Sequence, residues 1–304
     1  MAFMRDVPQQ GVVCLGGGAG ASLMRLLCRI TVGIILVSAV PTAARAEVKF
    51  GILPRLGPVE LFTMFNPLAQ YLTKETGEKV SIVIPKDFAA FNAAVRQGQI
   101  DLGFANPVVY VQLKRDIALE PLALAAELKA GTKFRGIIIT RKESPVRRIQ
   151  DLKGKKLVFV DRDSAAGYIF QMLLLHHAGF DVRRDLTVLP FAKTHDNVVQ
   201  AVYNGAADAG GIREDDFDRV KRKIDISRLR IVAYTDYYPN WPVFASPSLS
   251  KEVTAKIRAA LLRLKPNEAA SAGILWSAGL IGFSMVQDTD YDHLREAAQV
   301  AGAF

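Results

Sequence analysis

Apolar and polar residues alternate in two different rhythms along the first part of the chain. Residues 47–53 (EVKFGIL) follow the two-residue period of a strand, whereas apolar side chains recur at helical spacing over residues 59–76, where Gly77 marks the end. Similar patterns predict a strand over 80–84, a helix over 88–96 and a strand over 100–104. Such short connections between alternating strands and helices predict an α/β lobe, with helices on both faces of a mainly parallel sheet.

A second segment repeats this order of elements. The patterns predict strands over 157–160, 186–190 and 207–212, and helices over 165–178 and 197–203. The segments 96–103 (RQGQIDLG) and 203–210 (YNGAADAG) also match in their letters: each ends a helix at Gly, and an Asp three positions later begins a strand of small residues. This echo predicts a second lobe of similar construction that faces the first across a cleft.

Two further segments connect the predicted lobes. Residues 135–140 (RGIIIT) are strongly β-forming and suit a crossing into the second lobe, and the chain returns near 239–245. The tail from residue 250 onward has a helical pattern and is expected to pack on the first lobe. The domain prediction is therefore lobe one over 47–136, lobe two over 137–240 and a return to lobe one over 241–304. Two hinge crossings between mixed, mainly parallel sheets would allow the lobes to close over a ligand.

The segment before residue 47 has the three parts of a secretory signal peptide. Arg25 and Arg29 form a cationic start, residues 30–40 are apolar, and a small-x-small site (Ala-Arg-Ala) precedes Glu47. The apolar part is about half of the roughly 20 residues that cross a bilayer. We therefore predict a cleaved signal peptide over 1–46 and a periplasmic protein. Met24 alone begins a complete leader, so we expect translation to start there.

Composition and charge narrow the function further. The chain has 304 residues, of which 50% are hydrophobic and 23% charged, as in a folded globular protein. The net charge is +9; the leader has four Arg and one Asp, so residues 47–304 keep 35 basic and 29 acidic residues, or +6. This mild surplus argues against nucleic acid and favours a small anion. Both cysteines, Cys14 and Cys28, lie in the leader, which excludes disulfides and thiolate sites from the mature chain.

The chain resembles a known family, the periplasmic substrate-binding proteins of the phosphate/phosphite/phosphonate branch of ABC importers. The matching segments are 50–54, 65–68, 98–104, 151–156, 164–168, 194–196, 204–208, 282–283 and 290–291. The resemblance implies the two-lobed, Venus-flytrap fold of periplasmic binding proteins, a ligand held between the lobes, and a membrane permease as the partner.

The resemblance also implies where the ligand lies. The family has a hydroxyl-rich run that opens a helix in lobe two and grips a phosphorus oxyanion; here the run reads Ser164, Ala165, Ala166 and Gly167, with two hydroxyls absent. The free N–H groups of a helix start still favour an anion. Aromatic positions that are commonly Tyr appear as Phe88 and Phe104, and His195 matches a family histidine. Because of these departures, the sequence allows two classes of ligand: a phosphonate- or phosphite-like oxyanion, or a carboxylate.

Each candidate also has a plainer structural role. Ser164 or Asn106 could cap a helix, Arg55 could be solvated at the end of the first strand, His195 could be a turn residue, Tyr110 could be a half-buried helix residue, and Arg213 could pair with Glu214 or Asp215. The predicted ligand-binding set is Arg55, Phe88, Asn106, Tyr110, Ser164, Ala165, Ala166, Gly167, His195 and Arg213.

Enzyme and metal motifs are missing from the sequence. His176 and His177 are adjacent on a predicted helix, where side chains point about 100° apart, so they do not suit one metal ion. Neither a Gly-x-Ser-x-Gly elbow nor a zinc-helix motif is present. We therefore predict a monomeric binding protein without cofactor or metal. The alternatives are a receptor that presents its ligand to a membrane histidine kinase, and an enzyme on the same fold.

Overall fold

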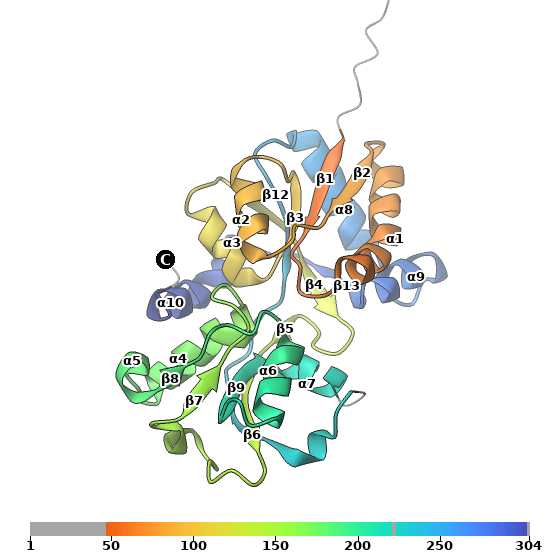
Figure 1. Ribbon diagram of the computed structural model, residues 1–304. Helices are drawn as coiled ribbons and strands as arrows, with labels where there is room; N and C mark the ends of the chain where they lie inside the picture. The colour runs from red at the N-terminus through yellow and green to blue at the C-terminus, as the bar shows by residue number, and fades with distance from the viewer. Residues whose placement is uncertain (1–46, 221–222, 303–304) are drawn as a thin grey trace, which may run out of the picture. The chain divides into compact units, whose positions relative to one another are not determined.

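The structure is a computed structural model that describes residues 47–220 and 223–302 (Figure 1). The predicted signal peptide over 1–46 lies outside these residues. Within the described ranges, no helix combines the length and the apolar composition needed to cross a bilayer.

The first sheet has six strands in the order β13-β4-β12-β3-β1-β2. Strand β1 runs parallel to β2 and β3, as the sequence pattern predicts, and β12, β4 and β13 extend the sheet with antiparallel pairings. The strands are β1 (Val48–Ile52), β2 (Val80–Val83), β3 (Leu102–Phe104), β4 (Glu120–Glu127), β12 (Pro242–Ala245) and β13 (Leu280–Ser284).

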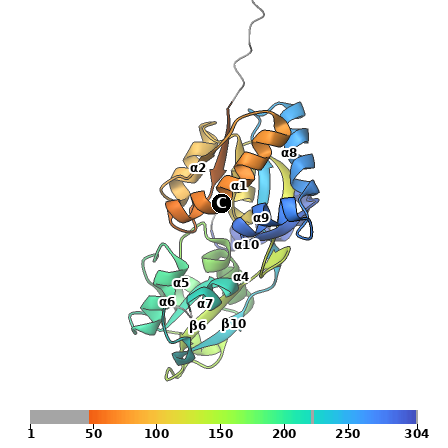
Figure 2. The same cartoon turned by 90° about the vertical axis from the view of Figure 1, so that its right-hand side faces the viewer.

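Helices cover both faces of this sheet. Helix α1 (Pro58–Thr76) connects β1 to β2, and α2 (Phe88–Arg96) connects β2 back past β1 to β3. Because both crossovers are right-handed and run in opposite directions across the sheet, they place α1 and α2 on opposite faces, as Figure 2 shows. Helices α8 (Lys251–Arg263) and α9 (Ala269–Ser277) pack on α1, and α3 (Pro107–Lys114) packs on α2.

The second sheet repeats this plan with five strands in the order β10-β6-β9-β7-β8. Strand β7 is parallel to β8 and β9, and β6 and β10 are antiparallel. The strands are β6 (Gly136–Arg141), β7 (Lys156–Val158), β8 (Thr187–Val188), β9 (Ala209–Arg213) and β10 (Leu229–Tyr234). The two sheets are thus mixed and only partly parallel, because the strands that carry the chain between lobes pair in the antiparallel sense.

The second sheet carries its own helices (Figure 1). A π-helical turn, η2 (Ala165–Ile169), continues directly into α4 (Phe170–His177). The remaining helices are α5 (Val182–Asp185), α6 (His195–Tyr203) and α7 (Glu214–Val220), with the single-turn helices η1 (Ile149–Leu152) and η3 (Ile226–Arg228) between strands.

The echo between residues 96–103 and 203–210 corresponds to equivalent places in the two sheets. Gly98 and Gly205 end α2 and α6 with positive φ angles of 66° and 80°. The carboxylate of Asp101 accepts from the backbone N–H of Lys49 at 2.9 Å, and that of Asp208 accepts from the N–H of Lys156 at 2.9 Å. Each Asp thereby ties the start of β3 or β9 to the parallel strand beside it, which is β1 in the first sheet and β7 in the second.

The chain crosses between the sheets twice, and the two crossings pair with each other. Strand β5 (Lys133–Phe134) lies on the way from β4 to β6, and β11 (Tyr238–Pro239) lies on the way from β10 to β12; they form a small antiparallel sheet. The chain ends with η4 (Asp288–Tyr291) and α10 (Asp292–Val300), which packs on α3 and α4. One hydrophobic cluster extends from the first lobe into η2 and α4.

Candidate functional site

A small buried cavity of about 20 Å³ lies where several predicted site residues meet. Arg55 follows β1, Ser164 precedes η2, His195 begins α6 and Arg213 ends β9. These are carboxyl ends of strands and starts of helices, where open α/β sheets bind ligands. The lining residues are Arg55, Phe88, Asn106, Phe134, Ser164, Ala165, Ala166, His195, Arg213, Asp216 and Trp241. The structure thus brings eight of the ten predicted site residues together.

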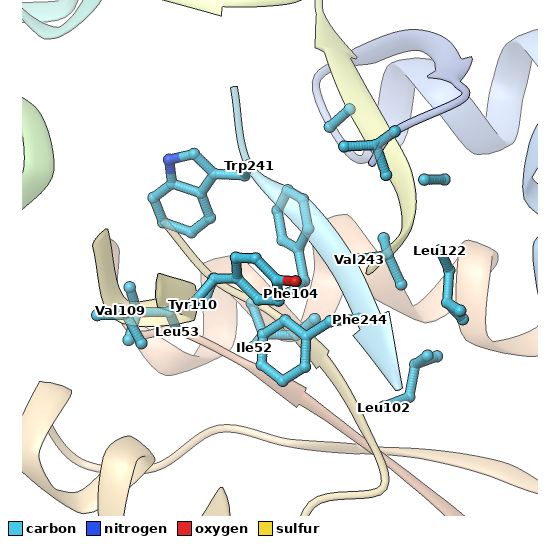
Figure 3. Close-up of a cluster of buried hydrophobic side chains, with 14 of the residues drawn as sticks. Ile52, Leu53, Leu102, Phe104, Val109, Tyr110, Leu122, Trp241, Val243 and Phe244 are labelled. Atoms are coloured by element: carbon cyan, nitrogen blue, oxygen red, sulfur yellow. The ribbon is translucent and has the colours of Figure 1, made fainter. Parts of the chain in front are cut away.

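Tyr110 does not join this group. It is fully buried in the core of the first lobe, where its ring lies 5.7 Å from that of Phe244 (Figure 3). Its hydroxyl donates to Asp288 at 2.8 Å. Tyr110 instead faces the C-terminal segment, because α10 packs on α3 and Asp288 of η4 accepts the hydrogen bond of its hydroxyl. We therefore leave Tyr110 out of the site.

Gly167 is the third residue of η2 and does not line the cavity either. A Cβ atom there would lie 2.5 Å from a methyl carbon of Val160 and 2.7 Å from the hydroxyl of Ser164. The glycine therefore lets the helix start approach the strand end that precedes it. Ser164 makes no capping hydrogen bond with its side chain, so the structure does not assign it the ordinary role of an N-cap.

Arg213 is a buried cation whose guanidinium is already engaged. It forms an ion pair with Glu127 at the end of β4, and its Nε donates to Asp215 at 2.9 Å. The guanidinium also lies over the ring of Phe134, 4.5 Å from the centroid. The interpretation that Arg213 pairs with Asp215 is confirmed, but Glu214 bonds Arg135 instead. Because Glu127 belongs to the first sheet, this ion pair joins the two lobes.

Arg55 and Trp241 present hydrogen-bond donors that the rest of the described chain leaves open. The guanidinium of Arg55 lies 5.5 Å from the ring centroid of Trp241, and its closest acidic atom is an oxygen of Glu127 at 3.8 Å. The indole N–H of Trp241 is buried and has no hydrogen-bond partner among the described residues. A buried donor that lacks a partner costs roughly 1–3 kcal/mol. Both residues line the cavity, so these donors are the first candidates for contact with an acceptor placed there.

His195 is held by both of its ring nitrogens. Its Nδ1 accepts from the backbone N–H of Arg213 at 3.1 Å, and its Nε2 lies 3.4 Å from a carboxylate oxygen of Asp216. An Nδ1 that accepts a hydrogen bond carries no proton, so the proton of the neutral ring is on Nε2 and faces Asp216. The residue before the cap of α6, Lys193, has a φ of 72°, and it is the one described non-glycine residue with positive φ.

The electrostatics of this pair follow from burial and from the surrounding arginines. Burial lowers the pKa of His195 below its usual value; the Asp216 carboxylate opposes this shift, and nearby guanidinium groups, Arg213 first, add to it. Burial alone would raise the pKa of Asp216, but His195 and the arginines outweigh it and lower the pKa to about 2. At neutral pH the pair is therefore an uncharged imidazole that donates to a carboxylate.

A second set of polar contacts joins the lobes beside the cavity. Asn106 caps α3 by accepting from the N–H of Val109 at 3.0 Å, and its amide donates to the backbone oxygen of Asp163 at 3.0 Å. The carboxylate of Asp163 accepts from Asn92 at 3.1 Å and from Gln112 at 3.2 Å. Burial raises the pKa of Asp163. Asn106 thus both caps its helix and connects to the loop before η2.

A larger cavity of about 820 Å³ shares Arg55 and Phe88 with the small one. Lysines and arginines line it together with carboxylates; one example is Asp196, which binds Arg219 at 2.8 Å and Lys223 at 2.5 Å. The two cavities are therefore neighbours, and charged side chains surround the larger one. Within the described ranges, no group of three or more His, Cys, Asp or Glu residues is arranged to hold a metal ion.

Sequence reasoning missed four residues of this site. Phe134 and Trp241 lie in the two crossings and carried no local signal beyond being aromatic. Asp216 was detectable, since it lies in the first turn of the helix that follows Arg213. Glu127 had no signal at all, because 86 residues separate it from Arg213 in sequence.

Comparisons with known proteins identify the family of this chain and its fold. A family model described as "ABC transporter, phosphonate, periplasmic substrate-binding protein" matches residues 50–291. The chain is 26% identical over 272 residues to the phosphate-import protein PhnD of Mycolicibacterium smegmatis. This match covers 83% of this chain and 84% of that protein.

Two further matches differ in what they cover. The chain is 25% identical over 246 residues to the tetrathionate sensor histidine kinase TtrS of Salmonella typhimurium, over 75% of this chain and 40% of the kinase. The structure of PhnD1 from Prochlorococcus marinus in complex with methylphosphonate matches with a TM-score of 0.73 at 18% identity, over 85% of this chain and 99% of that chain. The structural match confirms the two-lobed α/β fold.

Proposed function

Because the chain belongs to the family of periplasmic phosphonate-binding proteins of ABC transporters, we propose that it is an extracytoplasmic receptor that closes around a small oxyanion and delivers it to the permease of an ABC importer. The family consists of solute-binding transporter components, not enzymes. The work of the site is therefore binding and release. The proposed oxyanion is phosphonate- or phosphite-like, or a carboxylate.

The open donors of Arg55 and Trp241 carry this proposal. An oxyanion offers several acceptor lone pairs, and hydrogen bonds between charged groups are roughly twice as strong as neutral ones. The first N–H groups of η2, next to Ala165 and Ala166, have no partner within their own helix and add to the positive potential. These donors come from both lobes, so an anion among them would hold the lobes together.

The carboxylate of Glu127 resembles the kind of anion that Arg55 and Arg213 would bind. Its carboxylate contacts Arg213 and lies 3.8 Å from Arg55, so one oxyanion of the chain itself already lies against both cations. The small cavity has room for about one water molecule, which means that a ligand enters only if the lobes separate and close again. This opening and closing is the hinge motion that two crossings permit.

A receptor for a membrane histidine kinase is the second candidate. The observation that favours it is the 25% identity to the sensor kinase TtrS, whose length the match covers only in part. Both candidates use the same cleft. They differ in the partner that recognises the closed form.

A binding screen tests the proposal. Thermal unfolding of the purified protein is measured with phosphate, phosphite, phosphonates, sulfonates and carboxylates; a ligand at 100 times its dissociation constant stabilises the native state by about 2.7 kcal/mol. Trp241→Phe keeps an aromatic side chain but removes the open N–H together with the five-membered ring of the indole, so it should weaken binding by about fivefold or more. Trp276→Phe is the matched control, because Trp276 is 58% exposed on α9. If no oxyanion stabilises the protein, the proposed function is wrong.

A further inference from the structure

A second cavity, of about 630 Å³, lies at the hinge and shares no lining residue with the small cavity. Its walls come from both crossings (Lys133 and Tyr238), from α4 (Leu173) and from the C-terminal η4 and α10 (Asp290 and Glu296). Its volume is within the range of small-molecule sites, which is about 300–1,000 Å³. A cavity of this size that is formed by four separate segments is a candidate site in its own right.

Tyr238 supplies a polar atom in this cavity that the described chain does not use. The side chain is only 6% exposed, and its ring stacks on Phe170 with centroids 4.1 Å apart. Its hydroxyl makes no hydrogen bond with any residue in the described ranges and is not among the fully buried polar atoms there, so it can be reached from the cavity. Burial, and then the carboxylates of Asp236 and Glu296, raise the pKa of Tyr238 to about 12, so the hydroxyl stays protonated.

The charged groups around Tyr238 are mostly acidic. Asp236, Asp290 and Glu296 line the cavity together with one lysine, Lys133, and two histidines, His177 and His293. Asp290 is partly engaged, since it accepts from the N–H of Gln287 at 2.8 Å. The carboxylates of Asp236 and Glu296 form no ion pair or hydrogen bond with any described residue. The cavity therefore holds two unneutralised carboxylates.

An apolar wall completes the cavity. Leu124, Leu173, Tyr237 and Pro239 line it next to the acidic groups. Such a wall suits a hydrocarbon or aromatic body, while the carboxylates attract a positive charge.

We propose that this hinge cavity is a second binding site, for a small organic ammonium ion with an apolar body. The ammonium group lies between Asp236 and Glu296 within reach of the Tyr238 hydroxyl oxygen, which accepts a hydrogen bond from it. The body packs against Leu173 and Pro239. Small anions are repelled by the same carboxylates, so the site does not duplicate the oxyanion cavity.

Calorimetric titration with 2-phenylethylamine tests this inference on the purified protein. We expect a dissociation constant of about 1 mM or tighter. Tyr238→Phe keeps the ring stacked on Phe170 and removes only the hydroxyl, so binding should weaken about fivefold. The double variant Asp236→Asn/Glu296→Gln should weaken it about tenfold or more. Both acidic residues are exposed, so this variant is expected to fold normally.

The control variant is Glu252→Gln, an exposed carboxylate on α8 that does not line the cavity. It should bind the amine as the unaltered protein does. Absence of amine binding would overturn the inference, and so would equal binding by the double variant. Equal binding of the uncharged analogue 2-phenylethanol would show an apolar cavity that does not recognise charge, which also overturns it. None of these outcomes depends on whether an oxyanion binds in the other cavity.

Discussion

The guanidinium of Arg213 forms an ion pair with the carboxylate of Glu127, and the two residues belong to different lobes. Arg213 ends β9 in the second sheet, whereas Glu127 ends β4 in the first. The pair is buried beside the small cavity, where Arg55 approaches the same carboxylate. The two lobes are therefore joined by a carboxylate of the chain itself, next to the cavity where the proposed ligand would bring its own negative charge.

Glu127→Gln should bind anions more tightly than the unaltered protein. The substitution removes a negative charge that competes for Arg55 and Arg213, so we expect the dissociation constant of an anionic ligand to fall about fivefold. The free energy of unfolding without ligand should decrease by roughly 1–3 kcal/mol, because Arg213 loses a buried partner. Calorimetry and urea unfolding measure the two effects.

Glu214→Gln is the matched control for this change. Glu214 bonds Arg135 at 2.7 Å and does not line the small cavity. Its substitution should leave anion affinity unchanged. Weaker anion binding by Glu127→Gln would mean that the interlobe ion pair supports the site and does not compete for it.

Stability should fall in acid because of His195 and Asp216. Both have a lowered pKa in the folded protein. As pH falls, the unfolded chain therefore takes up protons on these two groups at a higher pH than the folded protein does. The stabilisation that the two groups provide is complete above their unfolded pKa and is lost as pH falls through their folded pKa. For His195 the loss begins below pH about 6.5, and for Asp216 it runs from pH about 4 to about 2. The Asp216 contribution is about 2 kcal/mol.

Asp216→Asn should remove the loss of stability that Asp216 causes between pH about 4 and about 2. Urea unfolding at several pH values between about 4 and 2 should show a smaller loss of stability in the variant than in the unaltered protein. Asp116→Asn, at an exposed position on the first lobe, serves as the control. Identical pH profiles for all three proteins would contradict the assignment.

Tyr110→Phe should lower stability without changing ligand affinity. The hydroxyl of Tyr110 donates to Asp288 at 2.8 Å inside the first lobe, and its loss should cost about 1 kcal/mol. Because Tyr110 does not line the cavity, the dissociation constant of an oxyanion should stay within about twofold. A loss of affinity equal to that of Trp241→Phe would return Tyr110 to the site.

Gly103→Ala should destabilise the first lobe strongly. A Cβ atom on Gly103 would lie 2.2 Å from the ring of Phe244, which is fully buried and cannot move aside without disturbing the core. We expect a loss of about 1–3 kcal/mol in urea unfolding. Gly57→Ala is the control: its φ of −61° suits alanine, and nothing lies within 4 Å of the added atom. Equal stability of the two variants would show that β3 and β12 can separate freely.

Local periodicity predicted the elements whose packing follows directly from their own residues. Helix α2 occupies residues 88–96 as expected, and β1, α1, β2, α6 and α8 lie within the predicted ranges or a few residues from their ends. The repeated Gly and Asp positions also marked equivalent places in the two lobes. Strands β4 and β13 were not predicted, because alanine in one and glycine in the other give weak β-propensity, and their pairing comes from distant neighbours.

The sequence by itself determined that the chain alternates strands and helices in two similar lobes, and that Arg55, His195 and Arg213 stand at strand ends or helix starts. These properties depend on periodicity and on stop signals a few residues apart. Only the tertiary structure decided that Glu127 and Trp241 join them, that Tyr110 does not, and that a second cavity forms at the hinge. Those outcomes depend on contacts between residues far apart in the chain, such as the 86 positions that separate Glu127 from Arg213, which no local pattern encodes.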